Sequence, residues 1–278
     1  MPNLAAVLRD AEQRLAHSSP SARLDAEVLL AHVLQKPRSY LAAWPAKTPP
    51  RDALAYFGEL LERRAAGQPV AHLTGEREFW SLSLQVSEAT LIPRPETELL
   101  VERAATAIRR NAASRVLDLG TGSGAIALAL ALKFPRLKIT ASDASTEALR
   151  VAERNRKMLG ASNVSVVHSD WFQALNDDYE IIVANPPYVP GDDPHLREGD
   201  VRFEPRLALD GGDDGLECLR YIIRLAPRRL LHGGWLLLEH GFDQGAAVRE
   251  LLSAAGFSAV GTHRDLAGHE RVSEGRRQ

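Results

Sequence analysis

The segment with the clearest chemical potential is Asn185-Pro186-Pro187-Tyr188, which follows the apolar run IIVA. A residue before proline is pushed toward extended backbone, and each proline fixes its own φ angle and lacks an N–H donor. We therefore expect a stiff corner whose free polar groups are hydrogen-bond acceptors. The Asn185 side-chain oxygen and the Pro186 carbonyl can both accept from one planar NH2 group, while Tyr188 offers a flat surface for stacking. This pattern predicts a site for a substrate nitrogen.

Methyl transfer is the chemistry that such a corner fits. The lone pair of an amide nitrogen is delocalised into its carbonyl, so the nitrogen is a weak nucleophile, whereas a sulfonium methyl group is a strong electrophile. Holding both N–H groups aims the nitrogen and stabilises positive charge as it develops. The scheme needs no general base, and a hydride-transfer enzyme has no use for the corner. The sequence thus favours an S-adenosylmethionine-dependent methyltransferase.

A glycine-rich loop, DLGTGSG at 118–124, lies between the predicted strand RVLDL and an Ala/Leu-rich helix. Glycines there let the backbone approach a ligand closely, with helix N–H groups exposed toward it. Gly120, Gly122 and Ala125 also satisfy the G-x-G-x-x-G/A pattern of nicotinamide enzymes. The loop therefore predicts a nucleotide-like cofactor without naming it, and a tight turn with nothing bound is the alternative.

Polar residues also follow the next two predicted strands. Asp143 comes about twenty residues after the glycine loop, where a carboxylate can accept both hydrogen bonds of a ribose diol; a helix cap before Ser145 is the structural alternative. Asp170 and Trp171 end the third strand, where an Asp can accept from an adenine amino group and an indole can pack on its face. Taken alone, a Trp after a strand is more often a core residue, but the place of Trp171 in a series of polar strand ends favours the ligand.

The elements that must position these residues fall into three parts. Residues 1–75 carry amphipathic helical spacing and predict a small helical domain. Residues 76–96 predict a short hairpin and a rigid linker. Residues 97–278 alternate strand and helix, which predicts a mostly parallel sheet with ligands beyond the carboxyl ends of its strands. Near the end of the chain we expect a helix over 216–230 followed by the strand WLLLEH at 235–240.

Composition narrows the function classes further. The chain has 278 residues and a net charge of −2, so it offers no general attraction to nucleic acid. Cys218 is the single cysteine, which excludes an intrachain disulfide and a cluster of thiolate metal ligands. The amino terminus lacks a secretion signal, and no apolar run reaches the roughly twenty residues of a membrane span. We expect a soluble, cytoplasmic protein without a metal site.

These motifs together resemble the bacterial protein glutamine methyltransferases that modify peptide chain release factors. The resemblance covers nearly the whole chain and includes the segments REFWSL at 77–82, LIPRPETE at 91–98, LDLGTGSGAIALAL at 117–130, SDW at 169–171, NPPYV at 185–189, DPHLREGDVRFEP at 193–205, LLLEHG at 236–241 and RDLAGHERV at 264–272. It implies a Rossmann-like class I S-adenosylmethionine-dependent methyltransferase domain, with a seven-stranded sheet, after a helical domain that grips the release factor. The implied target is the glutamine of a Gly-Gly-Gln (GGQ) loop.

Motif and resemblance together give two sets of candidate site residues. The candidate cofactor-binding residues are Gly120, Thr121, Gly122, Gly124, Asp143, Asp170, Trp171 and Asn185. The candidate substrate-binding residues are Asn185, Pro186, Pro187 and Tyr188, of which Asn185, Pro186 and Tyr188 are the candidate catalytic residues. Arg94, Glu98, Glu239 and His240 remain without an assigned role.

Three other functions share parts of this pattern. An adenine amino-group DNA methyltransferase would use the same corner, although it should need a basic face and a way to hold a flipped base. A non-catalytic protein that binds S-adenosylmethionine could keep the pocket, but would be expected to lose the Asn-Pro-Pro-Tyr corner. A nicotinamide oxidoreductase would share the glycine loop alone. The long aperiodic segment 191–215 predicts a lid or partner-binding loop in any of these cases.

Overall fold

The computed structural model describes residues 1–278, and the chain divides into two compact units. The first unit comprises Met1–Glu76 together with Glu198–Phe203, and the second comprises Arg77–Arg197 and Glu204–Gln278. None of the helices in either unit is both long and apolar enough to cross a membrane.

The first unit is a helical bundle. Its helices are α1 Leu4–Leu15, α2 Ala22–Leu34, α3 Arg38–Ala43, α4 Arg51–Ala65 and α5 Val70–Thr74. Leucines at helical spacing on α1, α2 and α4 converge on one core, which includes Leu8, Leu29, Leu60 and Leu61. The sequence predicted these three helices but not α3 or α5. Each of those two is one or two turns long and begins directly after a proline, so neither carries enough residues for a periodic pattern.

A buried arginine anchors the separate segment Glu198–Phe203 within this unit. Arg64 on α4 is 4% exposed, and its Nε donates to Asp25 Oδ2 at 2.7 Å while its Nη1 donates to Asp200 Oδ1 at 2.7 Å. The Ser19 hydroxyl also donates to Asp25, at 2.7 Å. Each buried charge therefore has an opposite charge beside it, and a piece of the long loop belongs to the helical unit.

The second unit is built on a seven-stranded sheet in the order β5-β4-β3-β6-β7-β9-β8. Its strands are β3 Arg115–Leu119, β4 Lys138–Asp143, β5 Val164–His168, β6 Tyr179–Ala184, β7 Leu230–Glu239, β8 Phe257–Arg264 and β9 Glu270–Arg277. The five strands from β5 to β7 are parallel, and β9 runs antiparallel to both its neighbours. The mostly parallel seven-stranded sheet expected from the sequence is confirmed.

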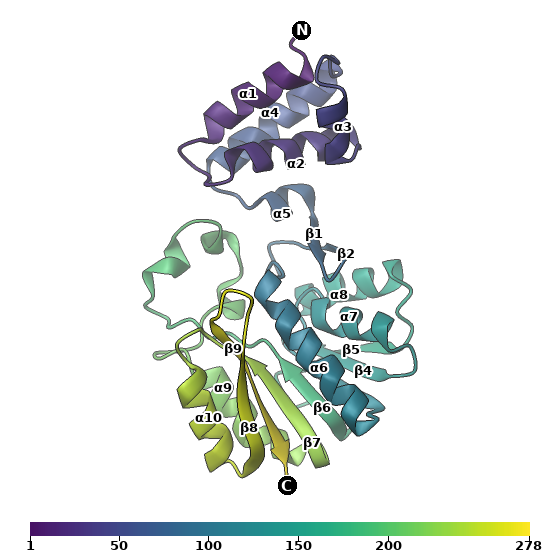
Figure 1. Cartoon of the computed structure of the whole chain (residues 1–278), viewed down its shortest axis with the longest axis vertical. Coiled ribbons are helices and arrows are strands. Elements are labelled where there is room, and N and C mark those ends of the chain that lie inside the picture. Colours follow the sequence, from purple (N-terminus) through teal and green to yellow (C-terminus); the bar gives the residue numbers. More distant parts are fainter. The chain divides into compact units, whose positions relative to one another are not determined.

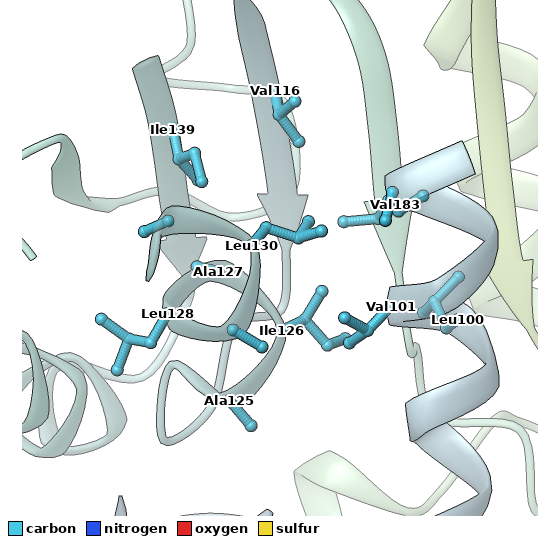
Figure 2. Close-up of a cluster of buried hydrophobic side chains, with 14 of the residues drawn as sticks. Leu100, Val101, Val116, Ala125, Ile126, Ala127, Leu128, Leu130, Ile139 and Val183 are labelled. Atoms are coloured by element: carbon cyan, nitrogen blue, oxygen red, sulfur yellow. The ribbon is translucent and has the colours of Figure 1, made fainter. Parts of the chain in front are cut away.

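Helices cover both faces of this sheet (Figure 1). They are α6 Glu98–Asn111, α7 Ala125–Lys133, α8 Thr146–Met158, α9 Glu217–Leu225 and α10 Gly245–Ala254. The second unit also contains single 3-10 turns at Pro95–Thr97, Pro194–Arg197, Arg206–Ala208 and Ala226–Arg228, whereas the turn Val201–Phe203 belongs to the first unit. Successive residues of a strand face opposite ways, so Val116 packs with α6 and α7 while Leu117 packs with α9 and α10. Figure 2 shows the first of these clusters, where Leu100, Val101, Ile126 and Leu130 meet the strand residues. Burial on both faces explains the near-continuous apolar runs of the parallel strands.

The prediction of a helix over 216–230 was wrong at its end. The helix α9 stops at Leu225, a 3-10 turn containing Pro227 follows, and β7 already begins at Leu230. Proline cannot donate the backbone hydrogen bond that would continue the helix. The strand is consequently longer than the apolar run WLLLEH that predicted it.

A short hairpin precedes α6. Its strands, β1 Glu76–Phe79 and β2 Leu82–Gln85, are joined by Trp80 and Ser81, which have φ angles of +53° and +59°. Two consecutive positive φ angles are typical of a two-residue hairpin turn that matches the twist of its strands. The Trp80 N–H donates to Glu98 Oε1 at 3.0 Å, so Glu98 at the start of α6 holds the turn.

The sheet changes direction between β3 and β6. From β3 the chain continues to β4 on one side, while β6 pairs with β3 on the other. Leu119 is the register partner of Ala184, so the glycine loop and the Asn185 corner leave the sheet side by side. Ligands of open α/β sheets bind at such a switch point.

Candidate active site

A cavity of about 260 Å³ lies at the carboxyl ends of β3, β4, β5 and β6. Its lining includes eight of the residues singled out in the sequence, namely Gly120, Thr121, Gly122, Asp143, Asp170, Trp171, Asn185 and Pro187. Three further candidates, Gly124, Pro186 and Tyr188, do not line it. The linker contributes Arg94, Thr97 follows directly after the linker, and the long loop contributes Leu207 and Asp210.

Two glycines of the loop leave space on the side of the cavity. Gly120 and Gly122 have φ angles of +70° and +57°, and a Cβ added at either would meet no protein atom within 4 Å. Their requirement is therefore conformational, and the space beside them is available to a ligand. Gly124 differs, because its Cβ would lie 3.0 Å from Leu128 Cδ1. It serves close packing against α7.

Two carboxylates hold the glycine loop in place. Asp143 Oδ2 accepts from the Gly122 N–H at 2.9 Å, and Asp118 Oδ2 accepts from the Thr121 hydroxyl at 2.7 Å and from the Ala127 N–H at 3.2 Å. The loop donors that a pyrophosphate would need are thus partly occupied by acidic groups. An acidic loop disfavours a dinucleotide and suits a cofactor that carries positive charge.

Asp143 orders the start of α8 and also faces the cavity, so its predicted contact with a ribose stays compatible with its structural role. Its Oδ1 accepts from the Ser145 N–H at 2.8 Å, which orders the start of α8, and its side chain also lines the cavity. Each carboxylate oxygen has two acceptor sites, so both retain capacity for a ligand hydroxyl. Burial raises the pKa of Asp143, although hydrogen bonds from Ser145 and Gly122 counter that shift.

Trp171 closes another side of the cavity in a strained backbone conformation. Its φ angle is +47°, which is an outlier for a bulky residue, and the Ser169 hydroxyl stabilises it by donating to the Trp171 carbonyl at 2.7 Å. The indole packs at a tilt against Tyr221, with ring centroids 6.4 Å apart. Asp170 beside it is exposed and accepts from Gln173 Nε2 at 2.6 Å. Trp171 therefore packs against the core and lines the cavity at once, and its contact with an adenine ring stays a prediction.

The Asn185 corner presents its amide in a defined orientation. Asn185 Nδ2 donates to Thr97 Oγ1 at 3.2 Å, which leaves Oδ1 as the free acceptor beside the cavity. Pro186 is buried, and Tyr188 is half-buried with its hydroxyl donating to Glu239 Oε1 at 3.3 Å. Burial and the charge of Glu239 raise the pKa of Tyr188 well above its ordinary value, so the phenol stays neutral. Tyr188 contributes to the rigid wall behind the corner.

Several residues that support the site were given no role by the sequence. Asn155 is fully buried on α8 and bridges two segments, because its Oδ1 accepts from the Gln85 N–H at 2.7 Å and its Nδ2 donates to the carbonyls of Gln85 and Ser123 at 2.9 and 2.8 Å. Asp118 is the next-to-last residue of β3 and Glu239 is the last of β7, and both carboxyl groups are fully buried. Burial raises the pKa of each to about 7. A polar residue at a core position of an otherwise apolar pattern was the available clue.

The remaining unassigned residues have structural partners. Arg94 pairs with Glu204, which also accepts from the Ile92 N–H at 2.9 Å and so fixes the linker. His240 is fully buried, with Nδ1 at 2.8 Å from the Gly241 carbonyl oxygen and Nε2 at 2.8 Å from Ser273 Oγ. Burial lowers the pKa of His240, so its imidazole is neutral and structural.

Known protein families match both the helical part of the chain and the part that forms the cavity. Two family models match: the PrmC N-terminal domain at residues 6–75 and the methyltransferase small domain at 95–198. A release factor glutamine methyltransferase of Pseudomonas aeruginosa is 54% identical over 276 residues, covering 99% of both chains. Another, of Vibrio cholerae, is 49% identical and covers 98% of this chain and 96% of its own.

The chain belongs to the release factor glutamine methyltransferase family. It is an S-adenosylmethionine-dependent methyltransferase, and the acidic glycine loop, open cavity and indole fit that cofactor. Solved structures agree on the class I fold. A methyltransferase from Pyrococcus furiosus has a TM-score of 0.52 at 20% identity, with 79% of this chain and 98% of that chain covered. A 16S rRNA methyltransferase of T. thermophilus, solved with AdoMet and guanosine, has a TM-score of 0.52 at 20% identity, covering 73% of this chain and 50% of its own.

Proposed function

We propose that this enzyme methylates the side-chain amide nitrogen of the glutamine in the GGQ motif of peptide chain release factors. The observation that carries the proposal is the orientation of Asn185, whose Nδ2 is bound to Thr97 and whose Oδ1 is left as an acceptor at the cavity. The names of its relatives support a release factor as the substrate. Residues 1–75 then serve as the substrate-binding domain, residues 76–96 as the linker and residues 97–278 as the catalytic domain.

The proposed chemistry relies on acceptors rather than on a base. Asn185 Oδ1 and the Pro186 carbonyl accept the two N–H groups of the glutamine amide, which holds the nitrogen in one orientation. These contacts also stabilise the positive charge that the nitrogen acquires on methylation. When bound, S-adenosylmethionine supplies an electrophilic methyl group. The surplus proton leaves the product nitrogen for water, so no side chain has to remove it.

The proposed cofactor site is the acidic half of the cavity. Asp143 retains acceptor capacity for ribose hydroxyls, Asp170 can accept from an adenine amino group, and Trp171 offers an aromatic face. Gly120 and Gly122 leave the backbone open to close approach. Thr121 and Gly124 shape the glycine loop. Asn185 and Pro187 lie where the proposed cofactor site meets the substrate corner.

Labelled methyl transfer tests the proposal directly. The enzyme is incubated with labelled S-adenosylmethionine and a purified release factor, with a matched release factor whose GGQ glutamine is replaced by alanine, or with double-stranded DNA. We expect label in the first sample alone, and mass spectrometry should locate it on that glutamine. Label in the alanine variant would contradict the GGQ target, and label in DNA alone would favour the adenine alternative. A cytoplasmic location stays a prediction.

A further inference from the structure

A buried carboxylate lies directly behind the substrate corner. Ala184 is the register partner of Leu238, so Glu239 at the end of β7 comes beside Asn185 at the end of β6. Glu239 is 1% exposed, and its Oε1 accepts from the Tyr188 hydroxyl at 3.3 Å. Its Oε2 is buried with no hydrogen-bond partner. An unsatisfied buried oxygen is costly, so its retention here requires an explanation.

Thr97 lies between this carboxylate and Asn185. The residue is 4% exposed, and its Oγ1 accepts from Asn185 Nδ2 at 3.2 Å. The Thr97 side chain is also near enough to Glu239 to lower the pKa of that carboxyl group, although Oε2 has no partner at hydrogen-bond distance. A hydroxyl has a single proton to donate. If Thr97 donates this proton to Glu239, it can only accept from Asn185, so the hydrogen bonds of the two neighbours are linked.

We propose that Thr97 and Glu239 are positioning residues that decide which end of the Asn185 amide faces the substrate. An ionised carboxylate can only accept, and the Thr97 hydroxyl is the donor that we assign to its unpartnered Oε2. Thr97 can then only accept from Asn185, which must turn its NH2 group toward Thr97. Oδ1 is left for the substrate. This inference rests on the function proposed above.

The chemistry gives this orientation a purpose. The two ends of a side-chain amide have nearly the same shape but opposite hydrogen-bonding character. If Asn185 were flipped, its NH2 group would meet the NH2 group of the glutamine substrate, and two donors would face each other. The substrate nitrogen would then lose one of the two contacts that hold it. Shape alone cannot prevent the flip, whereas a relay of donor and acceptor can.

The protonation of Glu239 sets the pH range of this relay. The charged and titratable groups that act on Glu239 are Tyr188, Arg271 and Glu96, of which Arg271 and Tyr188 lower its pKa and Glu96 raises it. Burial outweighs them and brings the pKa of Glu239 to about 7. A protonated carboxyl can donate to Thr97 and releases the constraint on Asn185. Methyl transfer should therefore decline as the pH falls through about 7.

Variants at Thr97 provide the first test. Thr97→Val keeps the shape but leaves Asn185 Nδ2 without an acceptor, and Thr97→Ser keeps the hydroxyl. We expect Thr97→Val to lower kcat/KM for the release factor by about ten- to a hundredfold, as when one buried partner is lost. Its cofactor affinity, measured by calorimetry, should be unchanged, and Thr97→Ser should restore most of the activity. Wild-type kcat/KM in Thr97→Val, or equal losses in both variants, would overturn the relay.

A second variant removes the titration without removing the acceptor. Glu239→Gln retains a carbonyl oxygen for Thr97 but carries no charge, so its kcat/KM should vary less between pH 6 and 8 than that of the wild type. An unchanged pH profile would contradict the role of Glu239. Asn185→Ala serves as the reference. If it is inactive while Thr97→Val equals the wild type, the relay fails and the proposed function stands; a wild type that does not methylate release factor overturns the proposed function itself.

Discussion

The ends of β3 and β6 lie side by side in the sheet, yet they form the site by opposite means. After β3 the chain has two residues without side chains, Gly120 and Gly122, whose positive φ angles leave open space beside the backbone. After β6 the backbone is rigid, because Pro186 and Pro187 fix their φ angles and have no N–H donors. On the proposed function, the open strand end accommodates the cofactor and the stiff strand end orients the substrate amide. Changes at the first should therefore affect binding, and changes at the second should affect turnover.

Asn185→Ala should have the largest effect and tests the second half of this comparison. It removes the free acceptor at the stiff corner, so we expect kcat to fall by roughly a hundred- to a thousandfold, as when one preorganised polar partner is lost. Cofactor affinity should stay within about twofold because the glycine loop is untouched. Single-turnover methylation and calorimetry measure the two quantities. Unchanged turnover would remove the proposed role of Asn185.

Asp118→Asn tests whether burial disfavours the charged form of the carboxylate that holds the glycine loop. Burial raises the pKa of Asp118 from 3.8 to about 7 in the folded chain. Between these values the folded chain holds a proton that the unfolded chain releases, so stability falls as the pH rises through this window. One such group contributes about 1.4 kcal/mol per pH unit.

Urea unfolding of the wild type and Asp118→Asn at pH 5 and pH 7 measures this contribution. Going from pH 5 to pH 7, the wild type should lose more stability than the variant, and the difference between the two proteins isolates Asp118 from the other titrating groups. Parallel pH dependences would show that Asp118 does not titrate in this window.

Gly122→Ala should act on binding, and Gly124→Ala is its matched control. Both glycines have positive φ angles, and forcing a side chain into that region costs about 1–2 kcal/mol. Only at Gly122 does the added methyl group point into open space at the cavity. We expect Gly122→Ala to weaken cofactor binding about tenfold, whereas Gly124→Ala, which crowds Leu128, should mainly lower the melting temperature. Equal cofactor affinities in the two variants would contradict the proposed difference between the two glycines.

Pro187→Ala should have the smallest effect and sharpens the claim of stiffness. Releasing one fixed φ angle increases the freedom of the unfolded chain and lowers stability by about 0.4–1 kcal/mol. Asn185 and its contact with Thr97 remain, so kcat should fall only severalfold. A loss as large as that of Asn185→Ala would mean that the second proline, rather than the acceptor side chain, dominates the site.

Much of the fold could be predicted from local pattern. The long helices α1, α2, α4, α6, α7 and α8 and the strands of the parallel sheet were all indicated by periodicity or by apolar runs. The short helices α3 and α5 and the end of α9 were not, because prolines rather than periodicity set their limits. The candidate site was found through the residues that follow each strand, since the carboxyl ends of parallel strands meet at one edge. The individual roles of those residues stay predictions.

By itself, the sequence determined which backbone angles are possible at the two strand ends, because glycine and proline act locally and need no partner. Only the tertiary structure decided which way Asn185 presents its amide, because its Nδ2 donates to Thr97 at the start of α6, while the pairing of β6 with β7 brings Glu239 beside it. Each residue type restricts its own backbone angles locally, whereas the direction of a buried hydrogen bond depends on every polar group that the fold brings to it.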